Sequence, residues 1–239
     1  MSRKPPEPPD LSQYGRLAEY RRKRRFDVTP EPPPKLAAAP RGRALEFVVQ
    51  KHRAGHLHYD FRLEHEGVML SWAVPKGPAP DPSIKRLAMQ TEPHPLDYNQ
   101  FEGVIPEGEY GGGTVMIWDR GSWESETDDV NRSLAKGDLK FRLRGAKLRG
   151  SWVLVRTRDR QWLLIKHRDE FVSTDDLTVT KPLSAVSRRT LAGIARAAGA
   201  SPRQLEAAKA ADPPRPARAA APAETRATSP GLARSTRSR

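Results

Sequence analysis

The sequence predicts a mainly β protein with the strand spacing of a compact closed β-barrel of about eight strands or of a β-sandwich, together with short peripheral helices and disordered termini. Short segments rich in Val, Leu, Ile and aromatic residues recur through residues 44–183, separated by Gly, Pro and Asp at intervals typical of β turns. The segment Leu57–Leu63 alternates apolar and polar side chains without interruption, as a half-buried strand does. All five tryptophans lie between residues 72 and 162, which favours one shared aromatic core.

The N-terminal part is expected in two pieces. Residues 1–19 are Pro-rich and predicted to be disordered, and residues 20–43 are predicted to be a basic strap leading into the core. A short helix within Leu11–Phe26 would carry the five consecutive cations of residues 21–25. The TPEPPP segment that follows is typical of an extended linker.

Residues 44–183 make up the predicted barrel domain, with short connections between its strands. The glycine-rich stretch Glu102–Thr114 lacks the GK[ST] ending of a phosphate-binding loop. Gly111–Gly113 is therefore interpreted as a tight turn between strands. The predicted strands are Ala44–His52, Leu57–Leu63, Val68–Val74, Arg86–Thr91, Thr114–Asp119, Leu139–Leu143, Ser151–Arg156 and Gln161–His167.

Residues 184–211 are predicted to be a helical extension. Leu191, Ile194 and Ala195 have helical spacing, and Ser201-Pro202-Arg203-Gln204 matches a capping box with Pro at the first helical position. Residues 212–239 are rich in Arg, Pro and Ala with few side chains to bury, so a disordered tail is expected.

The net charge of +13 is concentrated at the two ends of the chain. Residues 1–43 contain 11 Lys+Arg against 5 Asp+Glu, residues 212–239 contain 6 against 2, and residues 44–211 contain 25 against 22. Basic arms around a near-neutral domain favour a polyanionic partner such as nucleic acid, although such tails also serve solubility.

The composition excludes several classes of site and location. The absence of cysteine excludes disulfides, thiolate metal sites and a Cys nucleophile. The sequence contains no apolar run near the roughly 18 residues of a membrane span, and its first residues lack the apolar core of a signal peptide. An intracellular protein without membrane association is expected.

The polar face of the strand Leu57–Leu63 is the strongest candidate for a site. His58, Asp60 and Arg62 fall on one face, and His52 lies six residues before His58, across a short Gly-containing loop. Imidazole and carboxylate together suit a divalent transition metal, and a guanidinium suits an oxyanion beside it. The alternative interpretation is a solvated face without a function.

Three further positions are candidates for the same chemistry. His94 stands between two prolines, in a segment predicted to be an extended loop, with Tyr98 close behind. Lys76 and Arg86 flank the connection after the third predicted strand and have the charge to neutralise a phosphate. The alternative is a loop histidine and surface cations without a role.

Several long motifs together resemble one family. QKH followed by LHYDFRLE, SWAVPKGP, HPLDY, FEGVIPEGEYGGGTVMIWDRG and WLLIKHRDE occur in the order found in the 3′-phosphoesterase domain of bacterial ATP-dependent DNA ligase D. The resemblance runs from about Tyr20 to Pro182. It implies a stand-alone β-barrel enzyme of break repair by end joining. Such an enzyme uses a divalent metal, manganese above all, and removes a 3′-terminal ribonucleoside and a 3′-phosphate to leave a 3′-hydroxyl.

The resemblance also implies roles for individual residues. The metal ligands would be His52, His58 and Asp60, with Arg62, His94 and Tyr98 at phosphate and catalytic positions. Lys76 and Arg86 match basic positions around the pocket, and Arg24 and Glu31 match functional positions of the leader KRRFDVTPEP. Arg25 is a departure, because some members carry an acid there.

The resemblance implies partners and a location as well. The partners would be the 3′ ends of DNA or DNA/RNA primer-templates, a bacterial Ku-type end-binding protein and a DNA ligase, in the nucleoid region of the cytoplasm. Two other functions stay open. One is a non-catalytic DNA-end binding module; the other is a non-haem iron oxygenase in which His58, Asp60 and His94 form a facial triad.

Overall fold

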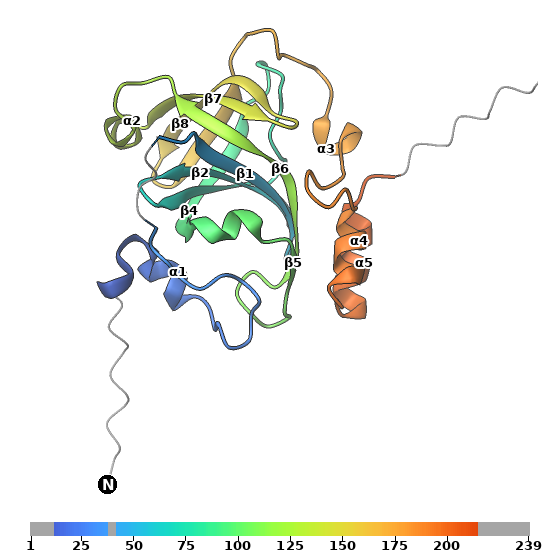
Figure 1. The fold of residues 1–239 in the computed structure, drawn as a ribbon. Helices are drawn as coiled ribbons and strands as arrows, with labels where there is room; N and C mark the ends of the chain where they lie inside the picture. Colours follow the sequence, from blue (N-terminus) through green and yellow to red (C-terminus); the bar gives the residue numbers. More distant parts are fainter. Residues whose placement is uncertain (1–11, 38–41, 215–239) are drawn as a thin grey trace, which may run out of the picture.

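The architecture is a single antiparallel sheet that closes on itself (Figure 1). The structure, a computed structural model, describes residues 12–37 and 42–214. The nine strands are β1 (Leu45–Arg53), β2 (Leu57–His65), β3 (Val68–Val74), β4 (Arg86–Pro95), β5 (Gly103–Ile105), β6 (Gly113–Ser125), β7 (Asp138–Gly145), β8 (Arg149–Arg158) and β9 (Gln161–Lys166).

Pairing of β1 with β6 closes the barrel. The strands follow one another in the order β1-β2-β3-β4-β9-β8-β7-β6, and β1 then pairs with β6 from Leu45↔Trp123 to Arg53↔Thr114. β5 is a short addition along the first residues of β6. The eight-stranded closed barrel predicted from the sequence is therefore confirmed.

The barrel interior is filled by the apolar face of each strand. On β2, Tyr59, Phe61 and Leu63 point into this core, as the strict alternation of the sequence requires. The five tryptophans are each at most 2% exposed, so they are core residues as predicted. The opposite face of β2 lies on the outside of the barrel, yet it too is largely buried.

The N-terminal segment covers that outer face. It contains η1 (Ser12–Leu17) and α1 (Ala18–Arg22), and Figure 1 shows it lying below β1, β2 and β4. Leu17 and Tyr20 are fully buried against Val68 of β3 and Tyr98 of η2 (Leu96–Gln100). Residues 12–19 thus belong to the folded part, which corrects the predicted boundary at residue 19; residues 1–11 lie outside the described ranges.

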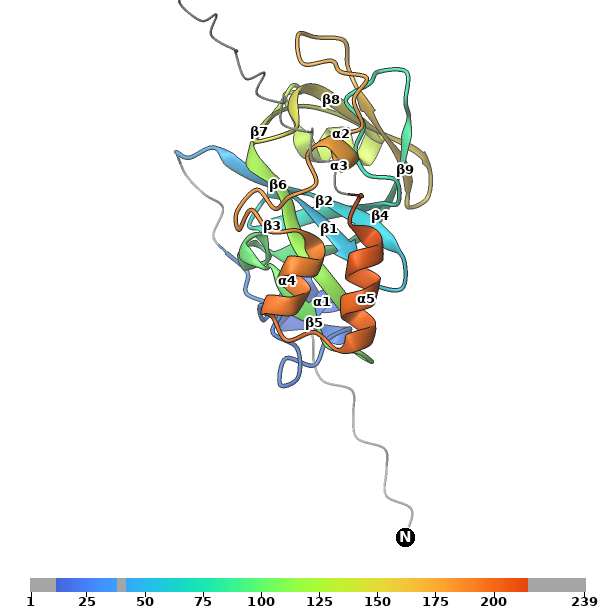
Figure 2. The same cartoon turned by 90° about the vertical axis from the view of Figure 1, so that its right-hand side faces the viewer.

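Two helices at the C-terminal end form a hairpin against the barrel, shown in Figure 2. They are α4 (Leu191–Ala197) and α5 (Pro202–Ala211), and the predicted capping box at Ser201 is present. The smaller helices are α2 (Val130–Lys136) and α3 (Leu177–Thr180). Residues 215–239 of the predicted disordered tail lie outside the described ranges.

The largest departure from the predicted elements concerns β4. This strand continues to Pro95, so His94 belongs to a strand and not to an extended loop. The pairing register of β3 with β4 shifts between Met69 and Ser71. This irregularity accommodates the stretch near the two prolines and lets Met69 pair with His94. Strand β5 and the helices η2, α2 and α3 were not predicted.

Within the described residues, no helix has the length and apolarity to cross a bilayer.

One end of the barrel contains a half-buried lysine with a low pKa. Lys147 donates from Nζ to the backbone oxygen of Leu183 at 2.6 Å, and Nζ lies 4.4 Å from the Trp118 ring centroid. Burial lowers the pKa of Lys147 to about 7, and the nearby cations Arg188 and Lys51 add to this effect. The charged ammonium is therefore less favourable in the folded protein than in the unfolded chain.

We expect the free energy of unfolding to rise between about pH 7 and pH 9, because the unfolded chain still binds the proton that folded Lys147 has released. Lys147→Met should reduce this rise of the free energy of unfolding with pH. The measurement is urea unfolding of both proteins across that interval. An equal pH slope in the wild type and the variant would contradict the assignment.

Candidate metal centre and phosphate-binding pocket

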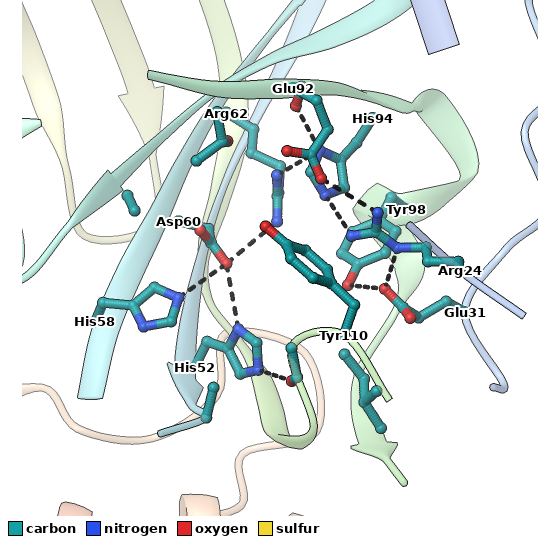
Figure 3. Close-up of a pocket in the computed structure, with 15 residues that line it drawn as sticks. Arg24, Glu31, His52, His58, Asp60, Arg62, Glu92, His94, Tyr98 and Tyr110 are labelled. Carbon is teal, nitrogen blue, oxygen red and sulfur yellow. Dashed lines mark hydrogen bonds and ion pairs between the residues drawn. The ribbon is translucent and has the colours of Figure 1, made fainter. Parts of the chain in front are cut away.

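The candidate site is a cavity of about 220 Å³ between the outer face of the barrel and the N-terminal segment (Figure 3). It contains the polar face of β2 and parts of β1, β3, β4 and η2. Its walls are formed by Arg24, Glu31, His52, Ala54, His58, Asp60, Arg62, Ala73, Thr91, Glu92, His94, Tyr98, Ile105, Tyr110 and Gly111.

Three predicted metal ligands converge in this cavity. His52 of β1 pairs directly with His58 of β2, so the hairpin between the strands brings the two rings together. Asp60 Oδ2 lies 3.6 Å from His52 Nδ1 and 3.7 Å from His58 Nε2. One ligand atom from each residue lies within 4.8 Å of the others. Two imidazoles and a carboxylate at this spacing fit a divalent transition metal.

The hydrogen bonds of the two rings leave the correct nitrogens free for a metal. His52 Nε2 lies 2.8 Å from the backbone oxygen of Gly111, and His58 Nδ1 lies 3.1 Å from that of His56. A carbonyl oxygen can only accept, so the hydrogen of each neutral ring is held on the nitrogen that faces away from Asp60. The lone pairs of His52 Nδ1 and His58 Nε2 therefore point toward the shared carboxylate, as metal ligation requires.

Arg62 provides the charge that keeps this carboxylate ionised. Burial alone would raise the pKa of Asp60, but the Arg62 guanidinium beside it holds the pKa well below its usual range. Arg62 Nη2 lies 3.2 Å from Asp60 Oδ2. Its Nε donates to Gln50 Oε1 at 2.9 Å and its Nη1 to Ser71 Oγ at 2.8 Å, which fixes the plane of the guanidinium.

His94 lies between two guanidiniums and is neutral. Its Nδ1 is 2.9 Å from both the backbone oxygen of Glu92 and Arg62 Nη1, and its Nε2 is 3.2 Å from Arg24 Nη2. Each ring nitrogen therefore faces a guanidinium, which can only donate. Burial, Arg62 and Arg24 together lower the pKa of His94 well below its usual value.

Arg24 anchors the N-terminal segment over the site. Its Nε donates to Glu31 at 2.8 Å and its Nη1 to Glu92 at 3.2 Å, while its guanidinium carbon lies 3.9 Å from the Tyr20 ring centroid. Glu31 also accepts from the Tyr98 hydroxyl at 2.9 Å. Burial and the Glu31 charge raise the pKa of Tyr98 well above its usual value, so this hydroxyl keeps its proton.

Most of the predicted site residues are brought together, and two are not. Lys76, which follows β3 and is exposed, and Arg86, at the start of β4, do not line the cavity. Sequence reasoning missed Glu92, which is 3% exposed and lies on the same strand face as His94. The two-residue spacing of Glu92 and His94 was the available signal, and the incorrect loop assignment hid it. Sequence reasoning also missed Tyr110, which lines the cavity.

The fold and the site define a class: a closed antiparallel β-barrel with a candidate His/His/Asp metal site beside a buried guanidinium. Residues 50–156 match the family model described as the DNA Ligase D 3′-phosphoesterase domain. The chain contains a domain of this family.

Relatives with similar sequences are multifunctional non-homologous end joining LigD proteins. The relative from Pseudomonas aeruginosa is 53% identical over 182 residues, covering 73% of this chain and 22% of its own length. Those from Mycobacterium bovis and Mycolicibacterium smegmatis are 46% and 41% identical, over 64% and 65% of this chain and 20% and 21% of their own lengths. The chain thus spans about a fifth of each of these relatives.

We expect Asp60→Asn to weaken Mn²⁺ binding by at least about 10-fold, because a direct ligand should cost no less than an outer-shell partner. Titration followed by electron paramagnetic resonance of free Mn²⁺ would measure this. Asp97→Asn, which removes an exposed acid from η2, is the matched control and should bind as the wild type does. If Asp60→Asn binds Mn²⁺ with the affinity of the wild type, Asp60 is not a metal ligand.

Proposed function

We propose that the protein is a metal-dependent phosphoesterase that heals DNA 3′ ends, removing a 3′-terminal ribonucleoside and a 3′-phosphate to leave a 3′-hydroxyl. The observation that carries the proposal is the convergence of His52, His58 and Asp60 within 4.8 Å, directly beside the Arg62 guanidinium at 3.2 Å from Asp60. A cation site and an anion site are thereby adjacent, as phosphate-ester chemistry requires.

His52, His58 and Asp60 would hold the metal, with manganese as the first choice. When bound, the ion would act as a Lewis acid that stabilises charge developing on the phosphate. Arg62 is held by Gln50, Ser71 and Asp60. A phosphate oxygen would therefore meet the remaining Nη2 hydrogen and the charge of a guanidinium that is fixed in one plane.

His94 is the proposed proton carrier of the site. It is neutral because burial and the flanking guanidiniums lower its pKa. A phosphate bound between Arg24 and Arg62 would offset these positive charges and raise that pKa. His94 would then hold a proton that it can transfer to the leaving oxygen.

Tyr98 and Glu31 would act differently from the phosphate-contacting residues. The Tyr98 hydroxyl donates to Glu31, and Glu31 in turn holds Arg24. We infer that both residues contribute by positioning Arg24 for the phosphate. Lys76 and Arg86 lie outside the cavity walls, so their proposed contacts would be to substrate atoms beyond the terminal phosphate.

The relatives support the cellular setting of the proposal. These relatives are named as multifunctional non-homologous end joining proteins, and we infer that this chain acts on DNA or DNA/RNA primer-template ends. A DNA ligase would use the 3′-hydroxyl, a Ku-type protein would hold the ends, and the bacterial cytoplasm near the nucleoid would be the site of action.

The iron oxygenase alternative exchanges one proposed ligand but keeps a donor set of two imidazoles and one carboxylate. His94 contacts Arg24 and Arg62 and does not belong to the metal-ligating group found among the described residues, where His52 takes its place. The two guanidiniums beside the centre favour an oxyanionic substrate. A DNA-end binding module without catalysis remains an outcome of the test below.

We expect Mn²⁺-dependent shortening of a 5′-labelled primer-template that ends in one ribonucleotide, and dephosphorylation of its twin that ends in a 3′-phosphate. EDTA and His58→Ala should each abolish both reactions, because each removes the metal centre. Denaturing gel electrophoresis is the measurement. If the primers stay unchanged in the presence of Mn²⁺ while DNA binding is retained, the protein is a DNA-end binding module and not an enzyme.

A second expectation concerns the 2′-hydroxyl of the terminal ribose, which we propose helps to position the phosphate for attack by water. The P–O5′ bond then breaks, and the terminal nucleoside leaves with a 5′-hydroxyl. A primer whose terminal ribose is replaced by 2′-deoxyribose should keep its terminal nucleoside, while 3′-phosphate release continues. Mass spectrometry of the two products measures both steps. Equal rates of nucleoside removal from ribose and deoxyribose ends would show that the 2′-hydroxyl is not needed.

A further inference from the structure

A second cavity opens beside the catalytic pocket and is formed in part by the C-terminal hairpin. We call it the hairpin groove; it has a volume of about 470 Å³ and is lined by Arg53, the loop residues 107–109 and 111–113, Arg203 and Gln204, among others. It shares Ala54 and Gly111 with the catalytic pocket. The hairpin lies outside residues 50–156, which match the family model.

The catalytic pocket alone is small for a nucleic-acid end. Its volume of about 220 Å³ is below the roughly 300–1,000 Å³ of typical ligand sites. The hairpin groove falls within that range. Because Ala54 and Gly111 border both cavities, the groove directly adjoins the catalytic pocket.

The hairpin is held firmly enough to be part of a binding site. Gln204 Nε2 donates to the backbone oxygen of Ile105 at 2.8 Å, and the buried Lys51 donates to that of Ala211 at 2.7 Å. Asp212 accepts from the backbone nitrogens of Leu191 and Ala192, each at 2.9 Å, and so joins the two helices. Figure 2 shows α4 and α5 side by side against the barrel.

The charges of the hairpin groove favour an anion. Among the described residues, neither Arg53 nor Arg203 forms an ion pair with a carboxylate. Arg53 Nη1 donates to the backbone oxygens of Ala54 and Gly55, which leaves its Nε and Nη2 for a ligand. Glu109 is neutralised by Arg25, whereas Glu107 accepts from the Ser201 hydroxyl and keeps its charge. With Arg25 counted, three guanidiniums stand against two carboxylates, a net positive charge that favours a phosphate.

The glycine-rich loop allows a close approach of the ligand backbone. Gly108 has open space where a Cβ would stand, whereas a Cβ on Gly112 would lie 2.7 Å from the backbone oxygen of Pro106. Tyr110, at 49% exposure, lies on the same loop and lines the catalytic pocket. An exposed aromatic ring at this boundary can stack on a base without regard to sequence.

We propose that the hairpin groove binds the sugar-phosphate backbone of the nucleotides that precede the 3′ end, with Arg53 and Arg203 as phosphate contacts. This inference rests on the proposed function for the identity of the end in the catalytic pocket. It assigns the C-terminal hairpin a role in substrate binding.

The test separates binding from catalysis. Fluorescence anisotropy in EDTA measures the affinity for a labelled oligonucleotide of about 12 nucleotides, within the site sizes of single-strand binding proteins. Arg203→Gln and Arg53→Gln are each expected to weaken binding about 10-fold and to lower the slope of log affinity against log salt by about 1. Arg196→Gln makes the same change at an exposed position of α4 outside the groove. It should leave both the affinity and its salt dependence unchanged.

Activity in Mn²⁺ gives a second readout. A dinucleotide that carries the same 3′ end is too short to fill the groove, so Arg203→Gln should slow processing of the long substrate and spare the dinucleotide. Wild-type affinity in both groove variants, or equal losses in Arg196→Gln, would overturn the proposal. If the wild type processes neither substrate, the proposed enzymatic function is wrong. The anisotropy measurement still shows whether the hairpin groove binds the nucleic-acid backbone.

Discussion

The buried guanidinium of Arg24 is the interaction on which the site depends. A charge removed from water must be paired and hydrogen-bonded, and Arg24 meets this requirement through Glu31, Glu92, His94 and the backbone oxygen of Tyr20. These partners come from the N-terminal segment and from β4. The network therefore fixes the segment over the outer face of the barrel, closes the cavity and sets the protonation of His94.

A barrel with two buried faces explains the form of the site. The interior holds a conventional aromatic core around Phe61 and Trp118, and this core makes the strands rigid. The exterior of β2 carries His58, Asp60 and Arg62, which the N-terminal segment shields from bulk water. Shielding strengthens every electrostatic interaction at the centre. The low pKa of Asp60 and the neutral state of His94 are consequences of the same arrangement.

The N-terminal segment and the C-terminal hairpin converge on one region of the barrel. The N-terminal segment provides Arg24 and Glu31 to the candidate pocket, and the C-terminal hairpin provides Arg203 and Gln204 to the adjoining groove. The glycine-rich loop between them contributes to both cavities through Gly111. A strand bound across the two cavities would contact segments about 180 residues apart, so substrate binding would couple the ends of the fold.

The sequence by itself determined the strands, the aromatic core and the polar face of β2, because period-two alternation and turn residues are local signals. The choice of a barrel over a sandwich came from the resemblance of its motifs to a known family. The sequence also placed His52 beside His58, since a short hairpin fixes their register. The tertiary structure alone decided that this face is buried, that His94 belongs to a strand, and that Glu92 pairs with Arg24. It alone placed Arg203 next to the pocket. These features depend on contacts between distant segments, which no local pattern encodes; Arg24 and Glu92 lie 68 residues apart.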